Sequence, residues 1–228
     1  MHIGVIPDGN RRYMQKFSIK NLEKAYNMGI DKIYEFIEWC ADLNIKEVTV
    51  YALSLENIKN RGEFEIITLL GLFSRQAINA MKDDRIHRNG IRIKICGDMD
   101  YLRSFDDDIG KDVVENLNKL EESTKGYDNM IVNMAIAYGG RQEIINAVRN
   151  IVNKGLDLNE ENIMMNLWVK SYPDFIIRTA ESRLSNFLTW QSAYSEIYFV
   201  NKLWQEINKE DLISIINNYR NRERRFGR

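Results

Sequence analysis

The chain has 228 residues, with 32 Lys plus Arg against 33 Asp plus Glu, so its net charge is −1. That near-balance argues against a nucleic-acid binder, which normally carries a basic excess. Hydrophobic residues make up 44% and charged residues 29%, the proportions of a folded chain rather than a disordered one. The two cysteines, Cys40 and Cys96, are far apart and match no metal spacing. Their placement argues against a disulfide scaffold and a structural zinc site.

No segment approaches the roughly 20 consecutive apolar residues that a membrane span requires. The amino terminus enters an apolar segment directly, without the basic region that begins a signal peptide. We therefore expect a cytoplasmic protein. Peripheral contact with a membrane surface stays open.

Short segments rich in Ile and Val alternate along the chain with longer segments of helical periodicity. Strands are expected at residues 2–7, 48–53, 91–96, 130–137, 175–179 and 196–200. Helices are expected at residues 22–43, 64–81, 107–120, 142–153 and 210–219. This alternation predicts an α/β fold in which a mostly parallel sheet of about six strands is flanked by helices. No linker or repeat divides residues 1–228, so we expect a single domain.

In open parallel sheets the ligand site lies beyond the carboxyl ends of the strands, so the residues there are the first candidates. The first strand is followed by Asp8, Gly9, Asn10, Arg11, Arg12 and Tyr13. An aspartate at a strand end can hold Mg²⁺, and a tight turn with two arginines can cradle a phosphate. An ordinary Asp-Gly turn explains the same residues equally well.

Two later strand ends and the start of the sixth strand carry weaker signals of the same kind. Ser54 and Glu56 follow the second strand, where a helix cap is the simpler explanation. Arg178 with Arg183 and Ser185 after the fifth strand indicates a second phosphate site. Glu196 opens the sixth strand, and a metal ion would satisfy a buried carboxylate there.

Other features of the sequence argue for or against particular classes of enzyme. The helix at 64–81 is apolar over a wide arc, which indicates burial on two sides or a wall around an apolar cavity. The two histidines have no nucleophile beside them in sequence, which argues against a Ser-His-Asp hydrolase. The sequence contains no GxxxxGK[ST] segment, which argues against a P-loop NTPase. Five arginines stand among the last nine residues, as a solvated tail or as a tail that folds over a polyanion.

Several long motifs in order resemble one known family. They are HIGVIPDGNRRY, VTVYALSLEN, KICGD, AYGGR, IIRTAESRLSNFLTWQSAYSEIYF and NRERRFG. The chain is similar over nearly its whole length to the cis-prenyltransferases, the family of undecaprenyl and dehydrodolichyl diphosphate synthases. The resemblance implies a homodimer, a parallel sheet and an apolar tunnel between the sheet and the helices. It also implies Mg²⁺-dependent condensation of an allylic diphosphate with isopentenyl diphosphate in cis geometry, which gives a polyprenyl diphosphate.

The resemblance also implies roles for individual residues. Asp8 matches the catalytic aspartate and Mg²⁺ ligand, Glu196 matches a second metal ligand, and Asn57 matches an asparagine assigned to proton removal. The expected substrate-binding residues are Gly9, Asn10, Arg11, Arg12, Tyr13, Ser54, Leu55, Glu56, Arg178, Arg183, Leu184, Ser185, Arg225 and Gly227. Arg225, Phe226 and Gly227 match a tail that reaches the partner subunit's site.

The chain departs from the family pattern at several of these places. A single Ala180 replaces two glycines before Glu181, and Ser182 stands where some members carry a histidine near the metal. Three further departures lie in the helix expected at residues 22–43 and after the second strand. They are Tyr26 for a histidine, Ile58 for an aromatic residue, and Asn60 for an arginine, with Arg61 one step later. One more basic contact has no clear match, and we place it at Lys20.

Two other functions stay open at this point. A non-catalytic partner subunit of a heteromeric synthase would have the same fold, but such subunits typically lose the aspartate or the arginines that this chain keeps. A homologue that releases a short or hydrolysed product would keep the site, and the shortened loop at Ala180 leaves room for it. The sequence determines neither the product length nor the allylic starter.

Overall fold

A six-stranded sheet forms the centre of the computed structural model, which describes residues 1–106 and 108–222. The strands are β1 (His2–Ile6), β2 (Glu47–Ser54), β3 (Ile91–Cys96), β4 (Met130–Tyr138), β5 (Phe175–Thr179) and β6 (Glu196–Val200). Their order is β3-β4-β2-β1-β5-β6, and every neighbouring pair is parallel. The six predicted strands are confirmed, and the sheet is parallel throughout.

The five long predicted helices are confirmed with shifted ends. They are α2 (Leu22–Asp42), α4 (Glu63–Ala80), α7 (Ile109–Thr124), α8 (Gly140–Asn153) and α10 (Lys209–Asn221). Asp107, the expected start of α7, lies outside the described residues. The short helices were not predicted, because so few residues show no helical period. They are α1 (Asn10–Lys16), α3 (Leu55–Asn60), α5 (Asp84–Arg88), α6 (Met99–Phe105), α9 (Glu160–Asn166) and the 3-10 helix η1 (Trp204–Glu206).

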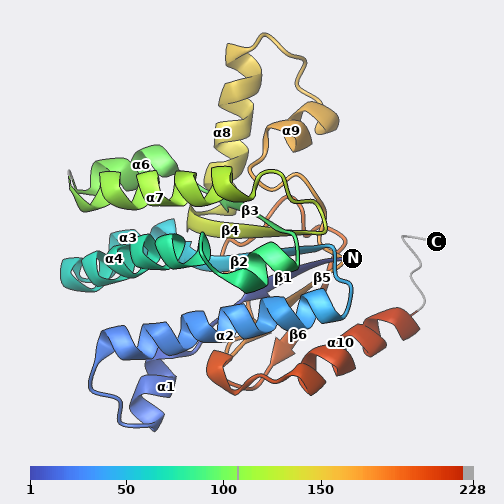
Figure 1. Ribbon diagram of the computed structural model, residues 1–228. Coiled ribbons are helices and arrows are strands. Elements are labelled where there is room, and N and C mark those ends of the chain that lie inside the picture. The colour runs from blue at the N-terminus through green and yellow to red at the C-terminus, as the bar shows by residue number, and fades with distance from the viewer. Residues whose placement is uncertain (107, 223–228) are drawn as a thin grey trace.

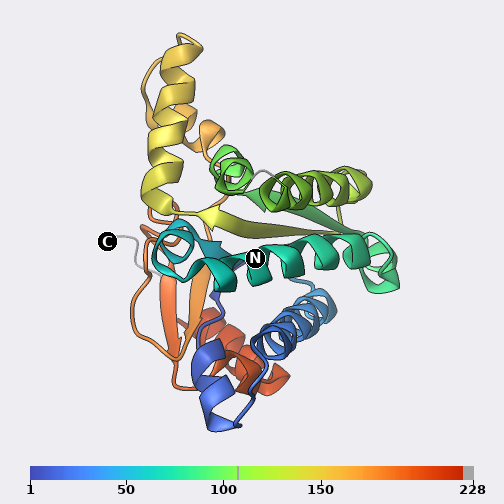
Figure 2. The ribbon, with the colours of Figure 1, turned by 90° about the vertical axis from the view of Figure 1, so that its left-hand side faces the viewer.

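Alternate strand residues pack on opposite faces of the sheet. Ile3 and Val5 of β1 belong to the large core under α2, α4, α7 and α10, whereas Ile6 packs with Tyr51 and Ile176 on the other face. Figure 1 and Figure 2 show α8 standing away from the body of the molecule, with α9 beside it. Cys40 and Cys96 are free and buried, and burial raises the pKa of both thiols.

The strand order fixes where a ligand site can form. The chain leaves β1 for β2 on one side and leaves β5 for β6 on the other, so β1 and β5 flank a topological switch point. Ile6 is paired with Arg178, which places Asp8 two residues beyond that level, at the carboxyl edge of the sheet. Strand order alone therefore brings Asp8 and Arg178 to one crevice.

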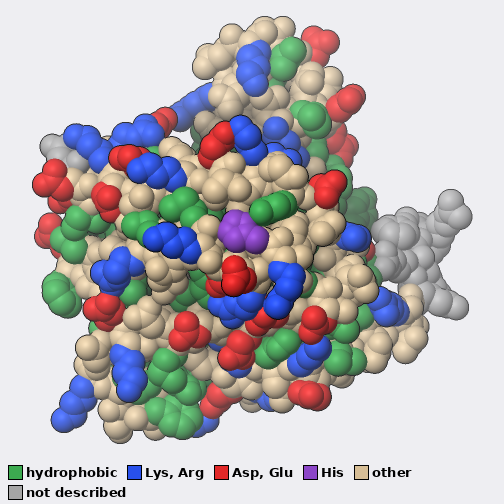
Figure 3. All heavy atoms as spheres, viewed as in Figure 1, with side chains coloured by type: hydrophobic (Ala, Val, Ile, Leu, Met, Phe, Trp, Pro, Cys, Tyr) green, Lys and Arg blue, Asp and Glu red, His purple; other side chains and the backbone are tan. Residues whose placement is uncertain are grey.

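The surface agrees with the balanced composition. Figure 3 shows basic and acidic side chains interspersed over the visible face rather than gathered by sign. Within residues 1–106 and 108–222, no helix has both the length and the apolar character needed to cross a membrane.

A buried polar network lies at the opposite, amino edge of the strands. His2 is 5% exposed, and its ring contacts the Thr49 hydroxyl at 2.8 Å and the Ser171 hydroxyl at 3.2 Å. Burial lowers the pKa of His2 below 6.5, although the carboxylates of Glu47 and Asp174 oppose that shift. The folded state therefore holds His2 neutral.

His2→Gln should flatten the dependence of stability on pH. The unfolded chain takes up the His2 proton more readily than the folded chain, so wild-type stability falls as pH drops below about 6.5. The contribution of one proton is at most about 1.4 kcal/mol per pH unit. Urea unfolding at pH 7.5 and 5.5 should show the larger loss in the wild type. Equal losses in both proteins would contradict a neutral, buried His2.

Candidate active site

A pocket of about 1020 Å³ opens at the carboxyl edge of the sheet. Two carboxylates line it, Asp8 and Glu56. Six of the described arginines also line it: Arg11, Arg12, Arg61, Arg141, Arg178 and Arg183. A chain with a net charge of −1 thus concentrates positive charge in one cavity, which suits a ligand with several negative charges.

Arg178 lies at the base of this pocket and is 3% exposed. Its Nη2 donates to Asp8 Oδ2 at 2.7 Å, while its Nη1 donates to the Ser185 hydroxyl at 2.7 Å and to the carbonyl of Arg183. Its Nε is buried without a hydrogen-bond partner in the described part of the chain. Such an orphaned donor beside a carboxylate indicates a site that an incoming anion completes.

The turn after β1 requires glycine. Gly9 has φ of 110°, and a Cβ there would approach the Cα of Leu203 to 3.2 Å and its side chain to 2.9 Å. The Gly9 amide donates to Asp8 Oδ1 at 2.6 Å, and α1 begins at the next residue. The first N–H groups of a helix have no intrahelical partner. Asn10 and the arginines after it line the pocket, as the phosphate-cradle interpretation of this turn expects.

The loop after β5 is held in an unusual backbone conformation. Ala180, Ser185 and Asn186 have φ of 65°, 48° and 64°. Asn186 binds the start of two helices, since its Nδ2 donates to Glu56 Oε1 at 2.8 Å and its Oδ1 accepts from the Arg141 amide at 2.9 Å. Left-handed residues of this kind accumulate at functional sites. Sequence reasoning missed Asn186, although asparagine tolerates this conformation better than most residues.

Glu181 connects the two predicted phosphate sites. Its Oε1 lies 3.0 Å from Nη2 of Arg12, and its Oε2 lies 2.8 Å from Nη1 of Arg183. Arg12 also donates to the carbonyl of Ala180 at 2.9 Å. The shortened loop thus places one carboxylate between an arginine from each site.

Two of the departures from the family pattern meet in space. Arg61 Nη1 donates to the Tyr26 hydroxyl at 2.9 Å and to Glu65 Oε1 at 3.0 Å, and Glu65 also pairs with Arg11. Burial raises the pKa of Glu65. The hydrogen bonds from Tyr26 and Arg11 and the charge of Arg61 outweigh that effect, so the pKa lies below its ordinary value. The arginine displaced by one position therefore still faces the pocket, anchored by Tyr26 and an ionised Glu65.

The end of β2 presents Asn57 to the same pocket. The Ser54 hydroxyl accepts from the Asn57 amide at 2.9 Å and begins α3, so it is a helix cap that also lines the pocket. Leu184 lines the pocket as expected. Leu55 does not, because it is 3% exposed and packs in the main core.

Three other expected site residues do not reach this pocket within one chain. Tyr13 stacks on Phe17 with ring centroids 4.5 Å apart and does not line the pocket, nor does Lys20. Glu196 is paired in register with Phe175, three residues before the level of Arg178, and its carboxylate accepts from the Tyr198 hydroxyl at 2.6 Å. It therefore lies toward the amino edge of β6, away from Asp8.

The predicted tail cannot be placed. Arg225, Phe226 and Gly227 lie outside the described residues, so their role in a partner's site stays a prediction.

Comparison with known proteins identifies the family. The family model Prenyltransf, which describes undecaprenyl diphosphate synthase, matches residues 6–227. A tritrans,polycis-undecaprenyl-diphosphate synthase (geranylgeranyl-diphosphate specific) from Thermoplasma acidophilum is 39% identical over 100% of this chain and 88% of its own length. The chain belongs to the undecaprenyl diphosphate synthase family.

Two solved structures agree with this assignment. A "probable undecaprenyl diphosphate synthase" from Campylobacter jejuni is 35% identical, with a TM-score of 0.83 over 100% of this chain and 98% of that chain. Lavandulyl diphosphate synthase from Lavandula x intermedia, solved in complex with dimethylallyl diphosphate, is 28% identical with a TM-score of 0.88 over the same shares. The protein is therefore a cis-prenyltransferase, an enzyme that transfers prenyl groups.

A second, apolar cavity of about 80 Å³ lies beneath α2 and α4 of the cis-prenyltransferase. Ile30, Ile33 and Phe73 line both spaces, so the arginine-rich mouth and the apolar cavity adjoin. The remaining walls come mostly from aliphatic residues of α2, α4, β3 and β4. A polar space and an apolar space thus share one wall.

Asp8 can hold a magnesium ion whose other ligands come from a substrate and water. Among the described residues there is no group of three His, Cys, Asp or Glu side chains that would enclose a metal ion by itself. Mg²⁺ is usually bound by one or two carboxylates together with phosphate oxygens and waters. Asp8 supplies one carboxylate in an arginine-rich pocket, and this fits an ion that is shared with an anionic ligand.

Glu65→Gln should weaken both the fold and the rim of the pocket. The substitution removes a charged acceptor shared by Tyr26, Arg61 and Arg11, and hydrogen bonds to charged groups contribute about 1.5–3 kcal/mol. Urea unfolding at pH 7.5 should show a loss of that order. Glu63→Gln is the matched control, because Glu63 is exposed in the same first turn of α4. Similar losses in the two variants would show that Glu65 acts only through the helix dipole.

Proposed function

We propose that the enzyme condenses an allylic diphosphate with isopentenyl diphosphate in cis geometry, with Mg²⁺, to give a polyprenyl diphosphate. The observation that carries this proposal is the adjoining pair of spaces, a pocket lined by Asp8 and six arginines and a mostly aliphatic cavity beside it. A ligand with a diphosphate head and a hydrocarbon tail matches both.

The arginines divide the two diphosphates between them. Arg11 and Arg12 follow the turn after β1, Arg61 shares Glu65 with Arg11, and these three would hold the allylic diphosphate. Arg178 and Arg183 lie after β5 and would hold isopentenyl diphosphate. Mg²⁺ bound at Asp8 would withdraw charge from the leaving diphosphate, as would the arginines that are already in position.

The reaction breaks the carbon–oxygen bond of the allylic diphosphate, and the electron pair leaves with the diphosphate. The isopentenyl double bond attacks the allylic carbon to form the new carbon–carbon bond, and loss of one proton restores a double bond. Asn57 is a neutral amide and a poor base. We assign it to orienting the acceptor, while a diphosphate oxygen or Asp8 takes the proton.

Two surfaces support the homodimer that the family implies. β6 is an edge strand whose Ile197 and Phe199 are 39% and 46% exposed. Val152 and Leu158, on the projecting region of α8 and the segment after it, are 71% and 66% exposed. A second copy that covers these groups would remove exposed apolar area and protect the sheet edge.

Membrane contact belongs to the same proposal, for a cytoplasmic enzyme that releases a lipid. The exposed rings of Phe17 and Phe64 follow α1 and open α4, two elements that the Arg11–Glu65 ion pair joins at the pocket rim. A peripheral contact there would let an apolar product pass to lipid without crossing water.

A short-chain product is the second candidate function. The cavity of about 80 Å³ is small for a long hydrocarbon, and the lavandulyl diphosphate synthase structure shows that the fold occurs in an enzyme with that name. A non-catalytic subunit is less well supported, because Asp8 and the arginines of both sites face the pocket together.

Asp8→Asn should reduce turnover about 10³-fold, since it removes the charge of the single proposed metal ligand at the step where charge develops. The assay is incorporation of radiolabelled isopentenyl diphosphate by purified protein with Mg²⁺ and each candidate starter, followed by chromatography of the products. Asp100→Asn, an exposed aspartate on α6, is the control and should retain the wild-type rate. No incorporation by the wild type would overturn the proposed function. An active Asp8→Asn would overturn the role of Asp8.

Arg183→Gln should raise the KM for isopentenyl diphosphate roughly ten- to a hundredfold, the effect of losing one charge-assisted contact. The KM for the allylic substrate should rise much less. Arg103→Gln, which removes an exposed arginine outside the pocket, is the control. Equal effects on both substrates would mean that the two diphosphate sites are wrongly divided.

A further inference from the structure

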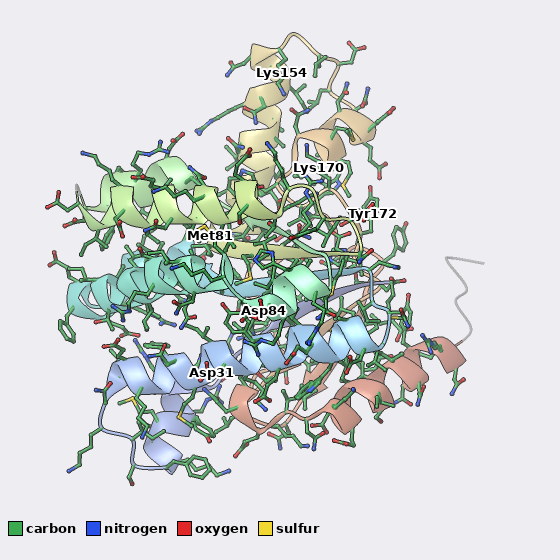
Figure 4. The ribbon with its side chains drawn as sticks, viewed as in Figure 1. Asp31, Met81, Asp84, Lys154, Lys170 and Tyr172 are labelled. Carbon is green, nitrogen blue, oxygen red and sulfur yellow. The ribbon has the colours of Figure 1, made fainter. Side chains whose placement is uncertain are left out.

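The segment that joins β6 to α10 packs against the turn after β1. Leu203 of this segment contacts Gly9 of the turn. The Trp204 amide donates to the carbonyl of Asp8 at 3.0 Å. Figure 4 shows the segment and α1 on the same side of α2, the helix that carries the labelled Asp31. The segment therefore helps to fix the backbone of the turn.

Gln205 of the same segment reaches a side chain of the site. Its Nε2 donates to Asn10 Oδ1 at 2.5 Å, and Asn10 lines the arginine-rich pocket. The two amides meet beside Gly29 of α2, where a Cβ would lie 2.5 Å from Asn10 Oδ1 and 3.4 Å from Gln205 Nε2. Glycine at this position of α2 therefore leaves the room that the pair of amides needs.

The hydrogen bond decides which end of the Asn10 amide is available to a ligand. Its oxygen is turned to Gln205, so its N–H groups remain for a ligand in the pocket. Turning both amides over would keep a hydrogen bond between them. It would also bury Gln205 Nε2 without a partner in place of Gln205 Oε1, which is buried and unpaired among the described residues. Unpaired buried N–H groups are rarer in folded proteins than unpaired carbonyl oxygens, so the observed orientation is favoured.

We propose that Gln205 is a positioning residue that keeps the N–H groups of Asn10 directed at the allylic diphosphate, an inference that rests on the proposed condensation. A diphosphate accepts hydrogen bonds and repels a carbonyl oxygen, so one of the two amide orientations favours binding. An asparagine without a partner would populate both orientations, and its apparent affinity would fall in proportion to the competent fraction. Gln205 removes that loss before the substrate arrives. It acts through Asn10, since it does not itself line the pocket.

Other contacts hold the segment in place without Gln205. Trp204 is 1% exposed, and its Nε1 donates to the Gly29 carbonyl at 2.9 Å. Glu206 forms an ion pair with Lys16 at the end of α1. A substitution at Gln205 should therefore leave the segment docked, so it tests the orientation of the amide rather than the fold.

Gln205→Glu should raise the KM for the allylic substrate about tenfold or more, because a carboxylate accepts from the Asn10 N–H groups and turns the Asn10 oxygen to the pocket. Gln205→Met removes the donor at similar length and should raise that KM about two- to fivefold. The KM for isopentenyl diphosphate should change much less. The assay is the initial rate of purified full-length protein with Mg²⁺ and a starter that the wild type accepts. Gln15→Glu is the matched control, because Gln15 is exposed on α1 and does not line the pocket.

The same two substitutions in an Asn10→Ala background separate positioning from added charge. Asn10→Ala alone should raise the allylic KM about tenfold, and neither substitution at Gln205 should then raise it further. If Gln205→Glu keeps its full effect in that background, the new charge acts on the substrate directly and the proposal is overturned. A wild-type allylic KM in both Gln205 variants, shown to be folded by thermal unfolding, also overturns it while the proposed function stands.

Gly29→Ala reaches the same amide from α2 and decides the question if the Gln205 variants do not fold. Its Cβ would displace Asn10 Oδ1, whereas alanine is the better helix former. A higher allylic KM that disappears in the Asn10→Ala background supports the positioning of Asn10. An unchanged KM in folded Gly29→Ala overturns it. No condensation by the wild type overturns both the proposed function and the role of Gln205.

Discussion

A buried guanidinium dictates much of the architecture around the pocket. Arg178 is 3% exposed, and a buried charge is stable only when its partners are in place. Its acceptors come from the end of β1, through Asp8, and from the loop after β5, through Ser185 and the carbonyl of Arg183. Satisfying Arg178 therefore fixes the switch point of the sheet and the left-handed loop in one arrangement.

Carboxylate acceptors are also shared between arginines at the rim of the pocket. Three carboxylates each contact two arginines: Asp8 contacts Arg12 and Arg178, Glu65 contacts Arg11 and Arg61, and Glu181 contacts Arg12 and Arg183. Sharing orients the guanidinium groups while it leaves the pocket with an excess of positive charge. Donors that are already oriented cost little reorganisation when negative charge develops on a leaving group.

The two ends of the apolar cavity differ in the polarity of their lining. Near the arginines it is lined by Ile30, Ile33 and Phe73, which offer a hydrocarbon no specific contact. At the far end Arg85 and Glu38 interrupt that apolar lining. Affinity for a hydrocarbon grows with the apolar area that it buries, so the aliphatic part of the lining supplies that affinity.

Sequence patterns determined the sheet and the centre of the site. Continuous Ile- and Val-rich segments predict buried parallel strands, and the rule that ligands bind beyond their carboxyl ends selects Asp8 and Arg178. Arg178 lies in β5 and Asp8 two residues after β1, so their positions follow from the strands themselves. Motifs shared with a known family supplied the chemistry, which no single turn would have indicated.

Only the tertiary structure decided which of the remaining candidates meet. Leu55 alternates into the core although its neighbours line the pocket, and Glu196 stands toward the wrong edge of β6 for Asp8. Arg61 reaches the pocket through Tyr26 on a helix 35 residues earlier in the chain. Hydrophobic periodicity is a local property that fixes strands and helices. The direction of a side chain and its distant partner depend on how those elements pack, and packing is a property of the whole chain.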